Sequence, residues 1–444
     1  MFKKLLLLSI LLPFTSVAQK TIKGNFAVDN GYKFGILYRI APDNVFYLAD
    51  SNVTPEGDFK LTLEDDIVPG MYRLVYNLPQ DQHFFDFLLD GKEDVAFNFS
   101  ADKNVTFITS EANKVYTTYR NQLNEYETSW EELFASEEVK NKELSKFLKE
   151  RTKWYNETLK QSEGTAAAPF IKATQPLLTE KFTTKEAYLS EAKEAYFSNF
   201  NFRDATLQNS GIPLEQSLKY IFNFVDEADL KASYNKNIDA LAKVIQPAEI
   251  TYQKHLLTSI WDFMVVNELP DEANYLAENY LIPIAKTSTD PALANELELY
   301  RNLSLGAVAP DFSWTEDING KTVSKTLRTL DEADNYIIVF WSALCSHCLS
   351  EVPKLHKEMA TQPEGTFKVI AVGIEDEKYD WQNTILEMPD FAHVLGLGKW
   401  ENEIGNKYDV SSTPTYFVLD KDKKIVAKPE TYETLLEVID QVKM

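Results

Sequence analysis

Apolar and polar positions follow a two-residue period in the first quarter of the chain. Residues 59–63 and 95–99 alternate in this way, and turn signals such as Asp90-Gly91 separate the runs. Side chains at alternate positions point to one face of a strand, so each run can bury one face and leave the other in water. We therefore predict a small antiparallel β-sandwich over residues 19–112.

The period lengthens to three or four residues between positions 113 and 304. Trp130, Leu133 and Phe134 recur at this spacing, with glutamate and lysine between such positions. This is the period of an amphipathic helix, and prolines interrupt the stretch several times. We predict an all-α region over residues 113–304 with its aromatic side chains in the core. His255 has no histidine or cysteine near it in sequence, so we expect no metal site there.

Strands and helices alternate from residue 305 to the end of the chain. The apolar run 336–341 predicts a buried strand, residues 345–360 predict a helix, and residues 415–419 predict a late strand. Alternation of this kind implies a sheet covered by helices on both faces. We therefore predict an α/β domain over residues 305–444 and a multidomain chain, which suits a length of 444 residues.

The two cysteines of the chain, Cys345 and Cys348, lie between the predicted strand and the helix that follows it. A helix N-terminus favours a thiolate at Cys345, which would be the attacking nucleophile. Cys345 would form a mixed disulfide with a substrate. Cys348, one turn further along, would be less exposed and would resolve that mixed disulfide by attacking Cys345. An inert buried pair is the weaker alternative. A zinc site is also weak, because the chain has no second Cys-x-x-Cys and no suitably spaced histidine pair.

Charge limits the classes of partner. The chain has 45 Lys+Arg against 68 Asp+Glu and a formal net charge of −23. A surface of this sign repels nucleic acid and anionic membranes. We expect no nucleic-acid partner.

The N-terminus has the pattern of a secretory signal peptide over residues 1–18. Lys3 and Lys4 precede the apolar run 5–12, and small residues lead to a cleavage site after Ala18. The run is too short for a membrane anchor, and no cysteine follows the cleavage site to carry a lipid. We expect an exported protein, periplasmic or otherwise outside the cytoplasm, that does not span a membrane after cleavage. Disulfide chemistry is common in such compartments.

The last third of the chain resembles thioredoxin-fold proteins, and more narrowly the exported TlpA-like and ResA-like thiol–disulfide oxidoreductases. Five elements carry this resemblance by their order and spacing: Ala309-Pro310-Asp311-Phe312, Phe340-Trp341, Cys345-Ser346-His347-Cys348, Glu351 with Pro353, and Thr413-Pro414-Thr415. The preceding β and helical regions resemble only the N-terminal regions that often precede such domains.

The resemblance implies catalysis by dithiol–disulfide exchange. Its redox group would be the Cys345–Cys348 disulfide, with no other cofactor. The partners would be cysteine-containing exported proteins and a membrane-bound redox protein, and the direction of electron flow stays open.

Glu351 is the third predicted catalytic residue. It falls three residues after Cys348, on the same face of the helix and toward the sheet. A carboxylate there would be partly desolvated, which raises its pKa and suits it to exchange a proton with Cys348. ResA-like proteins have a functional glutamate at this position, and Val339 stands where ordinary thioredoxins place a buried aspartate. A surface carboxylate without a role is the alternative.

His347 and Ser346, between the two cysteines, are candidates for tuning the redox potential. An imidazole near the Cys345 sulfur would stabilise the thiolate and make the disulfide more oxidising. Strongly oxidising members of the superfamily have a Pro-His pair here, and Ser346 replaces the proline. The alternative is that His347 is only an exposed polar residue.

Three residues are predicted to bind substrate. Thr413 and Pro414 match the cis-proline of the family, which lies opposite the disulfide and lets a partner peptide pair as an added strand. Trp341 is placed with them. Leu344 stands where many relatives have tryptophan, which changes the shape of this surface.

Two other functions remain open. Ala309-Pro310-Asp311-Phe312 also opens peroxiredoxin-like peroxidases, although Ser342 is a poor substitute for their threonine. A non-enzymatic module could instead hold Cu(I) through Cys345, Cys348 and His347.

Overall fold

The computed structural model describes residues 20–27, 31–42, 44–63, 67–136, 140–318 and 320–442. The predicted signal peptide, residues 1–18, lies outside these residues. The chain packs as two compact units, Met1–Phe263 and Met264–Met444, and each is described by itself. Among the described residues, no helix is both long enough and apolar enough to cross a membrane.

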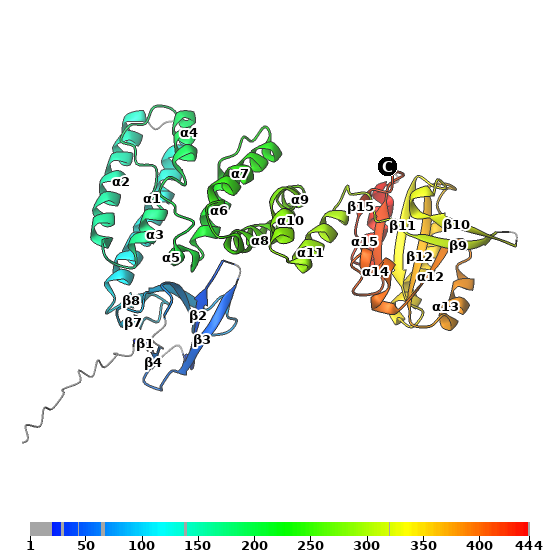
Figure 1. Cartoon of the computed structure of the whole chain (residues 1–444), viewed down its shortest axis with the longest axis horizontal. Helices are drawn as coiled ribbons and strands as arrows, with labels where there is room; N and C mark the ends of the chain where they lie inside the picture. Colours follow the sequence, from blue (N-terminus) through cyan, green and yellow to red (C-terminus); the bar gives the residue numbers. More distant parts are fainter. Residues whose placement is uncertain are drawn as a thin grey trace, which may run out of the picture. The chain divides into compact units, whose positions relative to one another are not determined.

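The first unit begins with a β-rich region. In the described part of the chain it forms two four-stranded sheets (Figure 1). One has the order β4 (Asp58–Thr62), β1 (Thr21–Phe26), β7 (Val95–Phe99), β8 (Val105–Phe107). The other has the order β3 (Val45–Asn52), β2 (Phe34–Ile40), β5 (Gly70–Val75), β6 (Phe84–Leu89).

Both sheets of this region contribute to one apolar cluster. Ile22, Phe59 and Phe97 come from one sheet, and Leu37 and Tyr72 come from the other. The alternation of buried and exposed residues along β4 is the period that the sequence predicts. The prediction of an antiparallel arrangement is wrong at one pair of strands, because β1 runs parallel to β7.

Helices follow the β-rich region. They are α1 (Glu111–Ala135), α2 (Asn141–Ser162), α3 (Ala168–Ala173), α4 (Lys185–Ala195), α5 (Ala205–Gln208), α6 (Ile212–Asn223), α7 (Leu230–Ile245) and α8 (Ile250–Val266). Asn113, in the first turn of α1, is buried and ties this helix to β6. Its amide oxygen accepts from the Leu88 N–H at 2.7 Å and its amide nitrogen donates to the Leu88 carbonyl at 2.8 Å. The helical middle region is therefore confirmed, and its first helix is fixed to the sheets.

The second unit also begins with helices. These are α9 (Pro270–Leu276), η2 (Ala277–Leu281), α10 (Ile282–Thr287) and α11 (Pro291–Asn302). Leu303, just after α11, belongs to the same apolar cluster as the strands that follow, and Leu299 packs against it. The packing unit thus begins well before the predicted boundary at residues 304 and 305. The three-segment division at residues 112 and 304 stays a prediction.

The remaining elements of the second unit surround one sheet. They are β9 (Ser313–Ile318), β10 (Lys321–Thr326), η3 (Leu327–Thr329), β11 (Asn335–Trp341), α12 (Ser346–Met359), β12 (Phe367–Glu375), α13 (Tyr379–Thr384), η4 (Ile385–Glu387), β13 (Ala392–Leu397), η5 (Lys399–Glu401), α14 (Glu403–Lys407), β14 (Thr415–Leu419), β15 (Ile425–Ala427) and α15 (Tyr432–Val442). The sheet has five strands in the order β13-β12-β11-β14-β15. β11 is parallel to β12 and antiparallel to β14.

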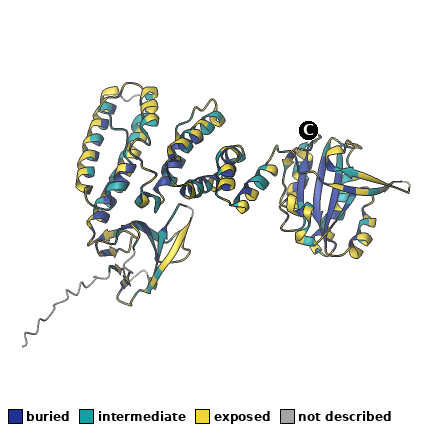
Figure 2. Cartoon of the chain, in the orientation of Figure 1, coloured by how far each residue is buried: buried dark blue, intermediate teal, exposed yellow. Residues whose placement is uncertain are grey.

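Both faces of this sheet are covered. On one face, Val352 of α12 and Leu435 of α15 pack with Val339 of β11. On the other face, Phe312 and Tyr408 pack with further strand residues. Figure 2 shows the strands of this sheet as buried and the outer sides of the helices as exposed. The predicted α/β domain is therefore confirmed, and the central strand β11 leads directly into the two cysteines.

Candidate active site

Cys345 lies where the buried strand β11 gives way to α12. It is the N-cap residue of this helix, and its sulfur accepts a hydrogen bond from the backbone N–H of Cys348 at 3.3 Å. The first N–H groups of a helix have no partner within the helix, so they point toward a group at the cap. The predicted position of Cys345 at a helix N-terminus is confirmed.

The surroundings of Cys345 act on its acidity in opposite directions. Partial burial of the sulfur would raise the pKa of the thiol. Hydrogen bonds from Cys348, the Thr413 side chain and the backbone N–H of His347 outweigh the burial and lower the pKa of Cys345 below its usual value. A sulfur that is partly exposed and has a lowered pKa is a nucleophile at lower pH than an ordinary cysteine.

Cys348 is fully buried. Burial, with a smaller contribution from the hydrogen bond to Cys345, raises its pKa to about 12. The two thiols are free in this structure. They therefore differ both in access and in acidity, as the sequence predicts for an attacking and a resolving cysteine.

The segment before β14 approaches Cys345 from the other side. The Cys345 thiol donates to the Thr413 carbonyl oxygen at 3.4 Å, and the Thr413–Pro414 peptide bond is cis. Both residues are partly exposed. The predicted cis geometry and the predicted place of Pro414 beside the cysteines are confirmed, while a role in binding substrate stays a prediction.

Glu351 is half-buried on α12, and Tyr416 of β14 contacts it. The Tyr416 hydroxyl donates to the Glu351 carboxylate at 2.9 Å. Burial, and then the bond to Glu351, raise the pKa of Tyr416, and the Cys348 sulfur contributes to the same rise. Tyr416 thus lies near both Glu351 and Cys348, the two groups that the sequence predicts to exchange a proton. The sequence analysis missed Tyr416, because only the pairing of β14 with β11 brings it here.

Glu375, the last residue of β12, is a second carboxylate near the cysteines. The sequence analysis did not predict it. It is 3% exposed. It accepts from the Ser342 hydroxyl at 3.0 Å and from the Ala343 N–H at 2.5 Å, so it holds the turn that leads to Cys345. Burial raises its pKa, and these two hydrogen bonds oppose the rise. The sequence does contain a feature that could have indicated Glu375, because it is an acidic residue at the end of an apolar run. That run forms a strand parallel to β11.

The structure corrects one predicted site residue. Trp341 is fully buried in the core at the end of β11, so its side chain does not face a partner. Ser346 and His347 are exposed. What reaches the Cys345 sulfur from His347 is its backbone N–H. Leu344 is 70% exposed beside the cysteines.

The structure also bears on the two alternative functions, a peroxidase and a metal-binding module. Ser342 is committed to the turn, because its hydroxyl donates to Glu375 and accepts from the Leu344 N–H at 3.2 Å. This geometry does not favour the role that a peroxidase would need from Ser342. Across the described part of the chain, no group of three or more His, Cys, Asp or Glu side chains could hold a metal ion.

Known proteins match the C-terminal part of the chain, which contains the two cysteines. Residues 334–425 match the model of a thioredoxin-like family. A ResA thiol–disulfide oxidoreductase from Bacillus cereus is 28% identical over 126 residues, which cover 28% of this chain and 69% of that protein. A domain of a possible thiol–disulfide isomerase from Cytophaga hutchinsonii is 30% identical, covering 32% of this chain and 94% of that one, with a TM-score of 0.27. The thioredoxin domain of a thiol–disulfide oxidoreductase from Bacteroides vulgatus is 29% identical, covering 31% and 97%, with a TM-score of 0.27.

The sheet order, the cysteine pair at the start of α12 and the family match together define a thioredoxin-fold protein. Within that fold, the C-terminal part of the chain is similar to ResA thiol–disulfide oxidoreductases. The comparisons given above cover only about the last third of the chain.

Proposed function

We propose that the protein is an exported thiol–disulfide oxidoreductase that acts on cysteine-containing proteins by dithiol–disulfide exchange. One observation carries the proposal. The partly exposed sulfur of Cys345 has a lowered pKa, and burial raises the pKa of the neighbouring Cys348 to about 12. Such exchange needs an attacking cysteine that is readily deprotonated and a resolving cysteine that stays protonated until the mixed disulfide has formed.

The reaction takes two steps in the reducing direction. The Cys345 thiolate attacks one sulfur of a substrate disulfide. The substrate S–S bond breaks, a mixed disulfide forms, and the released substrate sulfur takes up a proton. Cys348 then loses its proton and attacks the Cys345 sulfur, which frees the second substrate thiol. The substrate gains two electrons and the protein is left with the Cys345–Cys348 disulfide. Oxidation of a substrate dithiol is the reverse sequence.

The second step requires a proton acceptor, because a thiol with a pKa of about 12 is protonated at neutral pH. Glu351 and Tyr416 provide one. The Glu351 carboxylate accepts a hydrogen bond from the Tyr416 hydroxyl at 2.9 Å. Tyr416 in turn lies close enough to Cys348 for the two groups to affect each other electrostatically. Glu351 would take the proton during resolution and return it in the reverse reaction.

Substrate would dock at the segment that contains Thr413 and Pro414. This segment is partly exposed and contacts the Cys345 sulfur through the Thr413 carbonyl. An extended peptide that pairs with this backbone would bring its own cysteine to Cys345. The exposed Leu344 side chain offers an apolar contact beside the sulfur. Ser346 and His347, also exposed, would face the docked partner and set the potential.

We further propose that the redox group is the Cys345–Cys348 pair, with no further cofactor. A membrane-bound redox protein would return this pair to its starting oxidation state after each turnover. We also propose that the two N-terminal sheets pack as a mixed β-sandwich, because their side chains share one apolar cluster.

Export rests on the pattern of residues 1–18 and predicts that the chain is cleaved after Ala18. When the full gene product is made in a Gram-negative host, the mature protein is expected in the periplasmic fraction with Gln19 as its first residue. N-terminal sequencing of that fraction measures this. A chain that keeps Met1 and stays in the cytoplasm would contradict export.

The activity itself is tested by reduction of insulin disulfides with dithiothreitol as electron donor. Catalytic amounts of the full chain are expected to accelerate the reaction well above dithiothreitol alone. A Glu351→Gln variant is expected to slow turnover by about a hundredfold, in the range of a lost general acid–base group. The effect should fall on the resolving step, so the mixed disulfide should accumulate.

Tyr416→Phe is the matched partner of that variant. It keeps the ring and removes only the hydroxyl that binds Glu351. Its turnover is expected to fall in the same direction as that of Glu351→Gln, with a normal first attack by Cys345. No acceleration by the unsubstituted chain would overturn the function. An active chain with a fully active Glu351→Gln variant would remove only the role of Glu351.

A further inference from the structure

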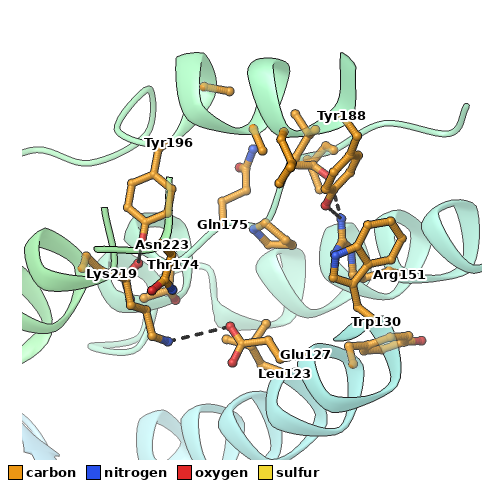
Figure 3. Close-up of a pocket in the computed structure, with 18 of the residues that line it drawn as sticks. Leu123, Glu127, Trp130, Arg151, Thr174, Gln175, Tyr188, Tyr196, Lys219 and Asn223 are labelled. Carbon is orange, nitrogen blue, oxygen red and sulfur yellow. Dashed lines mark hydrogen bonds and ion pairs between the residues drawn. The ribbon is translucent and has the colours of Figure 1, made fainter. Parts of the chain in front are cut away.

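A pocket of about 600 Å³ lies in the helical part of the first unit, far along the chain from the cysteines. Its walls come from α1, α2, α4 and α6 and from the segment 173–178 (Figure 3). This volume falls within the range of sites that hold small molecules. The function proposed above uses none of these residues.

Arg151 of α2 lines the pocket and is 5% exposed. One terminal nitrogen, Nη2, donates to the Leu177 carbonyl at 2.9 Å and to the Tyr188 hydroxyl at 3.2 Å. The Nε atom is buried and has no hydrogen-bond partner. Among the described residues, no carboxylate forms an ion pair with this guanidinium. Arginine stays charged at any ordinary pH, and a buried charge without a counter-charge is costly.

Apolar surfaces surround this charge. Trp130 of α1 packs against Tyr188 at 4.6 Å between ring centroids and against Phe134 at 5.0 Å. The Arg151 guanidinium lies 5.7 Å from the centroid of the Trp130 ring. Figure 3 shows Arg151, Trp130 and Tyr188 together at one side of the pocket. This side joins one cation to a broad aromatic wall.

The other charged groups of the pocket differ from Arg151. Lys219 at the opposite side is paired, 3.1 Å from Glu215 and 3.9 Å from Glu127. Tyr196 donates to Gln216 there at 2.8 Å. Glu131 also lines the pocket but is exposed to water. The cation that still lacks an anion is therefore Arg151, which also has the lowest exposure of these charged groups.

We propose that this pocket binds a small organic carboxylate with an apolar body. The carboxylate pairs with the Arg151 guanidinium, and the body packs against Trp130 and Tyr188. Charge-assisted hydrogen bonds to a buried guanidinium are strong, and the pair would neutralise the charge that the protein leaves unpaired. The aromatic wall accounts for the apolar part of the ligand, because contact with it removes apolar surface from water.

Isothermal titration calorimetry with the reduced full-length protein tests this site. The acids are acetate, hexanoate, 3-phenylpropionate and indole-3-acetate, and the neutral probe is 3-phenylpropanamide. We expect 3-phenylpropionate to bind at least about tenfold more tightly than the amide, which corresponds to about 1.4 kcal/mol. We also expect it to bind more tightly than acetate. Absence of saturable binding by all four acids, as when water alone fills the pocket, overturns the proposal. Equal binding of acid and amide overturns it too.

Variants then locate the anion. Arg151→Met keeps the aliphatic stem and is expected to weaken 3-phenylpropionate binding by about tenfold or more. Arg203→Met is the matched control, because Arg203 is exposed and does not line the pocket, and binding should not change. A loss of binding in Lys219→Met with full binding in Arg151→Met would contradict the assignment. Circular dichroism checks that each variant is folded. If Arg151→Met does not fold, the comparison of acid with amide on the unsubstituted protein decides.

Discussion

Replacement of Cys345 by serine is expected to lower the rate of disulfide exchange by about a thousandfold or more, because the nucleophile itself is removed. A serine hydroxyl at the N-cap of α12 can still accept the Cys348 N–H, so the helix should begin as before. The loss should therefore be chemical and should leave the fold in place. The insulin assay measures the rate, and thermal unfolding measures the fold.

Cys348→Ser is the matched variant, since it removes the other sulfur of the same motif. Cys345 keeps its partly exposed position at the start of α12, so the first attack is expected to proceed. The mixed disulfide then has no resolving thiol and should accumulate as a covalent adduct that dithiothreitol releases. Mass spectrometry of the adduct under non-reducing conditions reads this out. Adducts on Cys345→Ser but not on Cys348→Ser would reverse the two roles.

The sequence was sufficient for this part of the site because the contacts are local. A strand pattern, a turn and a helix pattern place Cys345 at a helix N-terminus, and one helical turn places Cys348 beneath it. The resemblance supplied the one distant contact, from Thr413 and Pro414 to Cys345. Its spacing is specific enough to predict the cis peptide bond that the structure shows.

Contacts between strands account for what the sequence could not provide. Tyr416 reaches Glu351 only because β14 lies beside β11, and Glu375 reaches Ser342 only because β12 ends at the same edge. Period and spacing do not encode these neighbours. The parallel pairing of β1 with β7 was missed for the same reason.

Two further differences come from burial and packing. The apolar run that predicts β11 continues into Trp341, and a residue at the end of a central strand is covered by the helices that pack on the sheet. A family position alone suggested substrate binding, but complete burial removes that role. The second unit, Met264–Met444, includes α11, and Leu303 just after this helix packs into the strand core. A helical pattern gives no sign of which core a helix joins.

Alkylation should separate the two sulfurs of the reduced protein. At pH 7, iodoacetamide is expected to label Cys345 at least about thirtyfold faster than Cys348. The pKa of Cys345 is lowered from its usual value near 9, and that of Cys348 is raised to about 12, a gap of at least about three units. Three units give about a thousandfold difference in thiolate at neutral pH. The less acidic thiolate is intrinsically more reactive, with a Brønsted slope of about 0.5, which reduces the factor to about thirty.

The pH dependence of labelling follows from the direction of each shift. The rate at Cys345 should rise with pH and level off at a lower pH than the rate at an ordinary cysteine, because its lowered pKa lets the thiolate form earlier. The rate at Cys348 should still rise at pH 10, and burial of its sulfur should slow it further. Peptide mass mapping after brief labelling measures both sites in one sample, and denatured protein gives the reference in which the two cysteines react alike. If folded protein labels both at equal rates at pH 7, the asymmetry is absent, and the observation that carries the proposed exchange reaction is lost with it.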